Sequence, residues 1–249
     1  MDPENNQADI AIEGLSKSFG TQKVLNGFNL HVAHAETVAV LGRSGTGKSV
    51  LLRLLIGLQK PDSGSIRIQG QEITTLATKP LNEIRKKIGF LFQQGALYDS
   101  LTVEQNVEFP LSRHTTLSDG ERKSRARELL ASVGMEQDMD KMPSQISGGM
   151  QKRVGLARAL ALDPAIVLLD EPTAGLDPIT AEEIGELISQ LQEKHKMTSL
   201  VVTHDLHGAR RFANRLVMLD RGNALFEGSV KDLEKSTNPF VIQYLKDAT

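Results

Sequence analysis

The stretch Gly42-Arg43-Ser44-Gly45-Thr46-Gly47-Lys48-Ser49 decides the fold of this chain. It matches the pattern G-x-x-x-x-G-K-[S/T] at every fixed position, and that pattern forms a loop around phosphate groups. Its glycines let backbone N–H groups turn toward phosphate oxygens, and the helix that follows adds free N–H groups. The stretch therefore predicts a phosphate-binding loop, with Lys48 near the β and γ phosphates and the Ser49 hydroxyl within reach of Mg²⁺.

Both flanks of this loop fit its expected context. Thr37–Leu41 is a short apolar run rich in β-branched residues, as expected of a buried strand. After the loop the apolar period changes, and Leu51, Leu52, Leu55 and Leu58 fall on one face of a helix. A plain glycine turn between strand and helix is the alternative, and the four constrained positions with correct flanks disfavour it.

The remaining segments alternate between strand-like and helix-like patterns. This alternation predicts an α/β fold with a largely parallel sheet, and early strands without intervening helices predict an added antiparallel layer. We expect strands near 10–12, 25–32, 65–69, 88–92, 166–169 and 199–202, helices at 82–87, 181–194 and 206–213, and a terminal hairpin at 215–220 and 223–227.

Residues from about 94 to 161 differ in character from the rest of the chain, because their pattern is helical and rich in charge. We interpret about 94–161 as a helical insertion into a core made of about 9–93 and 162–249. The sequence thus predicts a single domain over 1–249 that folds as two subdomains.

Length and composition limit the possible classes of protein. The 249 residues carry 29 Lys and Arg against 31 Asp and Glu, so the net charge of −2 gives no basic field for nucleic acid. Cysteine is absent, which excludes thiol catalysis and disulfides. No apolar run approaches the roughly 20 residues of a membrane span. Residues 1–8 are polar, so we expect neither order nor a signal peptide there, and any membrane role to be peripheral.

Two adjacent carboxylates, Asp170 and Glu171, follow the apolar run 166–169. Neighbouring like charges repel each other unless a cation offsets them. Asp170 is therefore a candidate Mg²⁺ ligand through water, and Glu171 is a candidate base that orients the attacking water and accepts its proton. An isolated Asp-Glu pair after a strand is more often a solvated turn, but the phosphate loop makes metal binding the better interpretation.

A second glycine-rich stretch, Ser147-Gly148-Gly149-Met150, precedes a helix rich in Ala and Leu. Alone, it would be a helix start with Ser147 as the N-cap. Placed between the phosphate loop and the acidic pair, it completes an ordered set of motifs that resembles the ATP-binding cassette ATPases over about 9–230. The resemblance implies a P-loop NTPase (RecA-like) core with an antiparallel β layer and a helical subdomain insertion, ATP and Mg²⁺ as cofactors, and ATP hydrolysis.

The resemblance also assigns single residues at matching positions. Phe19 lies where an aromatic ring stacks on adenine, although it would otherwise be taken as core. Gln93 matches a glutamine that touches Mg²⁺ and the γ-phosphate, and the adjacent Gln94 leaves a shift by one position open. His204 matches the switch histidine at the γ-phosphate, and Asp177 lies in the loop that crosses the dimer interface.

Together these assignments define the candidate site. In the implied dimer, the signature stretch 147–150 of one subunit closes on ATP held by a second copy, so two copies complete two sites. The candidate catalytic residues are Lys48, Glu171 and His204; the metal ligands are Ser49, Gln93 and Asp170; the ATP-binding residues are Phe19, Gly42, Arg43, Ser44, Gly45, Thr46, Gly47, Lys48, Ser49 and Gln93; and the signature residues are Ser147, Gly148, Gly149 and Met150.

Finer similarities look like the Mla-type ATPases of Gram-negative bacteria and related ATPases associated with Mce proteins. Such proteins energise phospholipid transport that maintains outer-membrane lipid asymmetry. The resemblance implies an integral-membrane permease, a substrate-binding Mce-type protein, a small cytoplasmic regulatory protein, no nucleic acid, and a peripheral location on the cytoplasmic face of the bacterial inner membrane. The segments that carry it are 95–98, 102–107, 110–111, 113–115, 142–144 and 177–180, with Met150 in place of the common glutamine.

Two other functions remain open from the sequence. One is the ATPase of an importer for a polar solute such as an amino acid, and the other is a soluble ATPase of cofactor assembly. A soluble assembly ATPase would co-purify with soluble proteins, whereas a transporter subunit would join a detergent-dependent complex with an integral membrane protein. A chromosome-associated ATPase is disfavoured because the chain has no long heptad segment and a net charge of −2.

Overall fold

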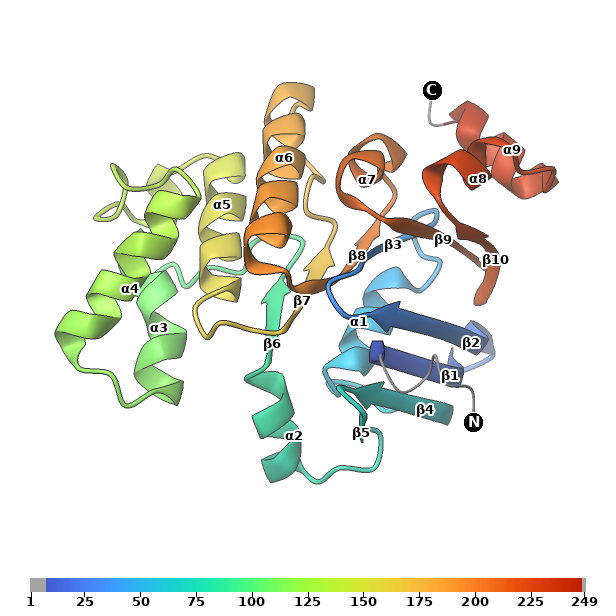
Figure 1. The fold of residues 1–249 in the computed structure, drawn as a ribbon, viewed down its shortest axis with the longest axis horizontal. Helices are drawn as coiled ribbons and strands as arrows, with labels where there is room; N and C mark the ends of the chain where they lie inside the picture. Colours follow the sequence, from blue (N-terminus) through green and yellow to red (C-terminus); the bar gives the residue numbers. More distant parts are fainter. Residues whose placement is uncertain (1–7, 248–249) are drawn as a thin grey trace.

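The fold contains two sheets, one antiparallel and one largely parallel (Figure 1). It is described from a computed structural model that covers residues 8–247. The expectations for the N-terminus fall on 1–7, outside the described residues, except that Ala8 already begins the first strand. The antiparallel sheet has the strand order β2-β1-β4-β5. Its strands are β1 (Ala8–Phe19), β2 (Gln22–Ala33), β4 (Ser63–Ile68) and β5 (Gln71–Glu72).

The second sheet has the order β10-β9-β3-β8-β7-β6, in which only the β9–β10 pairing is antiparallel. The parallel strands β3, β7 and β8 end at Leu41, Asp170 and Thr203, so their carboxyl ends meet at one edge, where ligands bind in open α/β sheets. The strands are β3 (Thr37–Leu41), β6 (Ile88–Leu91), β7 (Ile166–Asp170), β8 (Thr198–Thr203), β9 (Arg215–Asp220) and β10 (Asn223–Gly228).

Period-two alternation divides the core between the two faces of this sheet. In β3, Val38 and Val40 point into one apolar cluster, whereas Ala39 and Leu41 point into the other. The first cluster is shared with the antiparallel sheet and with α1 (Lys48–Leu55), which lies between the two sheets (Figure 1). Burial on both faces explains why the central strands appear in the sequence as uninterrupted apolar runs.

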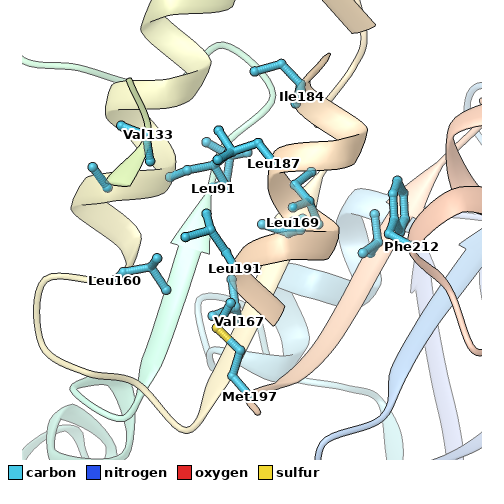
Figure 2. Packing of buried hydrophobic residues seen from close by; sticks show 14 of the residues in the cluster. Leu91, Val133, Leu160, Val167, Leu169, Ile184, Leu187, Leu191, Met197 and Phe212 are labelled. Atoms are coloured by element: carbon cyan, nitrogen blue, oxygen red, sulfur yellow. The ribbon is translucent and has the colours of Figure 1, made fainter. Parts of the chain in front are cut away.

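Helices cover the other face of the sheet. Ile184, Leu187 and Leu191 of α6 (Pro178–His195) pack toward β7, with Leu160 at the end of α5 beside them (Figure 2). The helices α3 (Val103–His114), α4 (Asp119–Ser132) and α5 (Gly148–Ala159) form a lobe beside β6 (Figure 1). Among residues 8–247, no helix has both the length and the apolar character needed to cross a membrane.

Some helix boundaries differ from the sequence prediction. The apolar face of α1 was expected to reach Leu58, but the helix ends three residues earlier. Gly57 adopts φ 63°, and the N–H of Leu58 returns to the carbonyl of Arg53 at 2.9 Å, which is the hydrogen-bond pattern of a glycine C-cap. The next helix, α2 (Thr78–Arg85), begins four residues before the expected start.

The C-terminal region contains two helices that the apolar pattern did not reveal. They follow α7 (Leu206–Phe212) and the β9–β10 hairpin, and they are α8 (Val230–Glu234) and α9 (Pro239–Asp247). A reciprocal capping box between Ser229 and Asp232 starts α8, and Pro239 stands at the start of α9. Both signals are present in the sequence, but these helices are too short for apolar periodicity to stand out.

Candidate active site

A cavity of about 470 Å³ opens at the shared edge of β3, β7 and β8. It brings together residues from the phosphate loop, from the hairpin of β1 and β2, and from the segments after β6, β7 and β8. Five segments far apart in sequence therefore face one space. The lining residues are Phe19, Gln22, Val24, Ser44, Gly45, Gly47, Lys48, Ser49, Val50, Gln93, Glu171 and His204.

Lys48 is a cation that lines this cavity, and its side chain is buried. Its Nζ donates to the carbonyl oxygens of Gly42, at 2.7 Å, and Arg43, at 3.2 Å, and lies 3.3 Å from Oε1 of Glu171. The lysine is thus held against its own loop by backbone acceptors. A phosphate in the loop would meet a cation that is already in position.

Gly47 gives this loop its shape. Its φ of 103° is a conformation that L side chains rarely adopt, and a Cβ there would lie 2.5 Å from Cγ1 of Val24. Gly47 also stands at the N-cap of α1, so the free N–H groups of the helix begin at the cavity. The fixed glycine of the sequence pattern therefore serves both the backbone turn and the close packing on β2.

Ser49 and Asp170 form a pair suited to Mg²⁺. The Ser49 hydroxyl donates to Oδ1 of Asp170 at 3.0 Å, across 121 residues of sequence. Burial raises the pKa of Asp170 above its usual range, and the hydrogen bond from Ser49 acts in the opposite direction. Residues 8–247 hold no cluster of three His, Cys, Asp or Glu side chains that would bind a metal alone. The pair still fits Mg²⁺, which is commonly held by one or two carboxylates and substrate phosphates.

Glu171 lies directly after β7 in a left-handed backbone conformation, with φ 46°. Its Oε2 accepts hydrogen bonds from the Thr203 hydroxyl at 3.1 Å, and from the backbone N–H and ring Nδ1 of His204 at 3.1 and 2.8 Å. The residue is only 7% exposed. Three donors from the end of β8 therefore fix this carboxylate in orientation, as a positioned base requires.

His204 is itself fixed from the C-terminal helix. The hydroxyl of Tyr244 on α9 donates to the His204 carbonyl at 2.8 Å. Burial, together with the negative charges of Glu171 and Asp205, raises the pKa of Tyr244 to about 12, so the phenol keeps its proton for this bond. A helix absent from the sequence prediction thus supports a candidate site residue.

Two predicted ATP-binding residues have distinct surroundings. Phe19 lines the cavity and is 47% exposed, so its ring is accessible to a base, and Nζ of Lys17 lies over the ring, 5.5 Å from its centroid. The Arg43 guanidinium lies instead beside α9, where it pairs with Asp247 at 2.9 Å and lies 5.8 Å from the Phe240 ring. Arg43, Gly42 and Thr46 are not among the described residues that line the cavity.

The signature residues lie apart from this cavity, because none of residues 147–150, nor Asp177, is among its described lining residues. The Ser147 hydroxyl caps α5 by accepting from the Met150 N–H at 3.2 Å, and the Met150 side chain packs against the core. Asp177 caps α6 by accepting from the Thr180 N–H at 3.1 Å. The hydrogen bond from Thr180 also lowers the pKa of Asp177. The structure gives Ser147 and Asp177 local capping roles within one chain.

Sequence reasoning missed Lys152 and Thr203. Lys152 on α5 is buried, and its Nζ donates to the carbonyl oxygens of Gln93 and Glu171. Burial lowers the pKa of Lys152 to about 8, while Asp170 and Glu171 counteract that shift. Lys152 stands between Gln151 and Arg153 in the sequence, so nothing marked it as buried, and Thr203 looked like an ordinary strand residue.

Comparisons with known proteins agree with this geometry. A family profile described as ABC transporter matches residues 25–174. The probable ribonucleotide transport ATP-binding protein mkl of Mycobacterium tuberculosis is 43% identical over 236 residues, covering 95% of this chain and 66% of that protein. The methionine import ATP-binding protein MetN of Brucella abortus is 40% identical over 228 residues, covering 92% and 62%. The chain spans less than two thirds of the length of these curated relatives.

Solved structures share the fold. A dimeric ATP-binding cassette, MJ0796, in a post-hydrolysis state bound to ADP and Pi, matches with a TM-score of 0.82 and 38% identity, covering 89% of this chain and 98% of that chain. CbiO1 of Clostridium perfringens, part of the ABC transporter complex cbiONQ, matches with a TM-score of 0.84 and 28% identity, covering 97% and 99%. These matches confirm the predicted fold class. The chain belongs to the ABC transporter family, as a member of its ATP-binding cassettes.

Proposed function

We propose that this chain is the ATP-hydrolysing subunit of an ABC transporter that powers phospholipid transport across a bacterial cell envelope. One observation carries the ATPase part of the proposal. The cavity at the ends of β3, β7 and β8 combines a phosphate loop, a hydroxyl paired with a carboxylate for Mg²⁺, and a buried, oriented glutamate. These groups are the ones that phosphoryl transfer to water requires.

In the proposed reaction, the N–H groups of the loop and Lys48 bind the β and γ phosphates. Glu171 accepts a proton from water as the water oxygen forms a bond to the γ-phosphorus, and the bond from that phosphorus to the β–γ bridging oxygen breaks. The products are ADP and inorganic phosphate. Mg²⁺, held by Ser49, Gln93 and, through water, Asp170, would neutralise the charge on the phosphate oxygens.

A second copy of the chain completes the site in this proposal. The signature residues 147–150 lie outside the cavity of their own chain and head α5 with a helix N-terminus, which suits an anion held by another subunit. The MJ0796 structure, 38% identical to this chain, is dimeric and bound to ADP and Pi. We therefore infer a homodimer in which the helical stretch 94–161 presents the signature to the partner.

A groove of about 790 Å³ offers a place for a membrane permease subunit. Aromatic side chains line it, among them Phe92 and Tyr98, which are 40% and 48% exposed. Basic residues, including Lys86 and Arg158, lie around them. Phe92 and Ala96 of this groove flank Gln93, which lines the ATP cavity, so a partner seated in the groove would act on the segment that carries Gln93. Such contact would hold the chain peripherally on the cytoplasmic face of the inner membrane.

The transported substrate is the finer part of the proposal. Phospholipid is supported by the segments that look like the Mla-type and Mce-associated ATPases, which would add an Mce-type protein and a small regulatory protein as partners. The MetN relative, named for methionine import, favours the amino-acid importer as the second candidate. The two functions differ in the companion proteins and in what stimulates ATP hydrolysis.

Purification from native membranes in detergent tests this proposal. We expect an integral permease to co-purify, together with an Mce-type protein and bound phospholipid, and the complex in lipid nanodiscs to hydrolyse ATP. Co-purification of a soluble amino-acid-binding protein, with hydrolysis stimulated by the amino acid, would support the importer instead. Recovery only with soluble proteins would contradict both transporter functions and support the assembly ATPase.

A further inference from the structure

Lys152 is a buried cation that the proposed reaction does not use. It lies in α5 and is 4% exposed. Its Nζ donates to two backbone carbonyl oxygens, that of Gln93 and that of Glu171, the latter at 3.0 Å. Within residues 8–247 it forms no ion pair of its own. Burying an unpaired ammonium costs free energy because the group loses its hydration. The hydrogen bonds to these two carbonyl oxygens offset part of that cost.

One of these contacts holds a strained residue. Glu171 adopts φ 46°, which is unfavourable for a residue with a side chain and persists only where neighbours fix it. Its N–H donates to the Val202 carbonyl at 2.9 Å, and its own carbonyl accepts from Lys152. The N–H of Ala174 also donates to that carbonyl, at 3.2 Å. The peptide groups that flank the Glu171 side chain are thus held from both sides.

The other contact holds the segment after β6. Gly95 and Ala96, which follow Gln93, adopt φ 72° and 48°. Arg158, six residues further along α5 than Lys152, donates to the carbonyl oxygens of these two residues at 2.6 and 2.7 Å. Two cations of one helix therefore hold the two segments that carry the candidate metal ligand and the candidate base.

The same helix begins at the signature stretch. Ser147 caps α5, and Lys152 lies five residues later. Both residues belong to one short helix, so any displacement of its N-terminus moves the Lys152 side chain with it. The lysine donates to the backbone carbonyl of Glu171, the residue whose side chain carries the cavity carboxylate.

We propose that Lys152 is a positioning residue, which holds the backbone of Glu171 and Gln93 against α5 so that the Glu171 carboxylate points at the nucleotide. The expected effect on ATP turnover rests on the proposed ATPase function. The expected fixing of the Gln93 and Glu171 segments does not, because it exists without nucleotide. The two consequences are measured separately, so a failure of one is distinguishable from a failure of the other.

The experiment compares Lys152→Met, which removes the donors and keeps the length, with Lys152→Gln, which keeps an N–H donor without charge. Hydrogen exchange of the full chain without nucleotide reports on the amides of Gly95 and Ala174, whose bonds to the Phe92 and Glu171 carbonyls lie in the held segments. We expect Lys152→Met to speed exchange at both by about tenfold or more, and Lys152→Gln to give an intermediate value.

ATP turnover of the same variants gives the kinetic readout. We expect Lys152→Met to lower kcat about tenfold with an unchanged KM for ATP, and Lys152→Gln to recover part of the loss. Arg125→Met is the control, because Arg125 pairs with Asp163 away from both segments, and it should match the wild type in both readouts.

Wild-type exchange at Gly95 and Ala174 in Lys152→Met would overturn the proposal, as would a raised KM with unchanged kcat. Should Lys152→Met fail to fold, Lys152→Gln carries the same test, and wild-type exchange and turnover in that variant would equally overturn it. A Glu171→Gln variant with normal turnover would instead refute the catalytic assignment, while the exchange result for Lys152 would stand.

Discussion

Nδ1 of His204 lies 2.8 Å from Oε2 of Glu171, and the two residues follow neighbouring parallel strands. A carboxylate only accepts hydrogen bonds, so the proton of this contact belongs to Nδ1. A neutral ring then has only an acceptor at Nε2, and donation from Nε2 to a phosphate requires the doubly protonated ring. In this arrangement the His204 ring donates to the Glu171 carboxylate and so helps to hold its orientation.

The hydrogen bond from Tyr244 on α9 to the His204 carbonyl can be tested with Tyr244→Phe, which removes one hydroxyl from a buried ring. We expect kcat to fall about threefold to tenfold, the range for one lost hydrogen bond, with KM for ATP unchanged. Steady-state kinetics measures both values. Wild-type kcat in a folded variant would show that the bond to the His204 carbonyl has no bearing on turnover.

Lys48→Ala should weaken nucleotide binding. The variant loses a cation held 2.7 Å from the Gly42 carbonyl at the phosphate loop, and charge-assisted contacts of this kind correspond to about 10- to 100-fold in affinity. Calorimetric titration with ATP measures the change. Lys23→Ala, at an exposed lysine of β2, is the control and should bind as the wild type does. Unchanged affinity in Lys48→Ala would count against the phosphate-loop assignment.

Ser147→Arg separates the signature role from the capping role. The arginine would block approach of a second subunit, so we expect ATP binding by the monomer to persist while turnover is lost. Ser147→Ala is the matched variant, since it removes only the cap of α5 and should cost about 1 kcal/mol of unfolding free energy. If Ser147→Arg unfolds the chain, Ser147 acts chiefly as a helix cap.

Acid should destabilise the chain through Glu36. Burial alone would raise the pKa of this carboxyl, but hydrogen bonds from Arg215 and from the Ala33 N–H, with the charge of Arg215, lower it overall from 4.5. The unfolded chain thus binds this proton more readily, so the contribution of Glu36 is present above pH 4.5 and lost as pH falls through the lower folded value. Urea unfolding across this range should show a flatter pH dependence for Glu36→Gln, and an equal dependence would contradict the assignment.

Much of the site was predictable because its parts follow one rule. The phosphate loop, the acidic pair and His204 each stand at the end of a buried parallel strand or directly after it, and such strand ends meet at one edge. Their mutual distances were not predictable. That Glu171 and His204 share a hydrogen bond depends on the adjacency of β7 and β8 and on the left-handed backbone of Glu171.

The residues that hold the site in place could not be predicted from the sequence, for a different reason. Lys152 and Tyr244 donate to backbone carbonyls 19 to 59 residues away. Every residue has such a carbonyl, so the residue type does not reveal which one accepts. Helix α9 is only nine residues long, and two of its contacts reach Arg43 and His204, which lie far away in the sequence. Such long-range contacts become visible only in the fold.

Glu171→Gln tests the central claim most directly, because the amide keeps the size of the side chain and cannot accept the proton of water. The measurement is size-exclusion chromatography with light scattering in Mg²⁺ and ATP, paired with phosphate release. The account predicts that the variant binds ATP, releases no phosphate above background and elutes as a stable dimer. Phosphate release at the wild-type rate would contradict the assignment of Glu171 as the base.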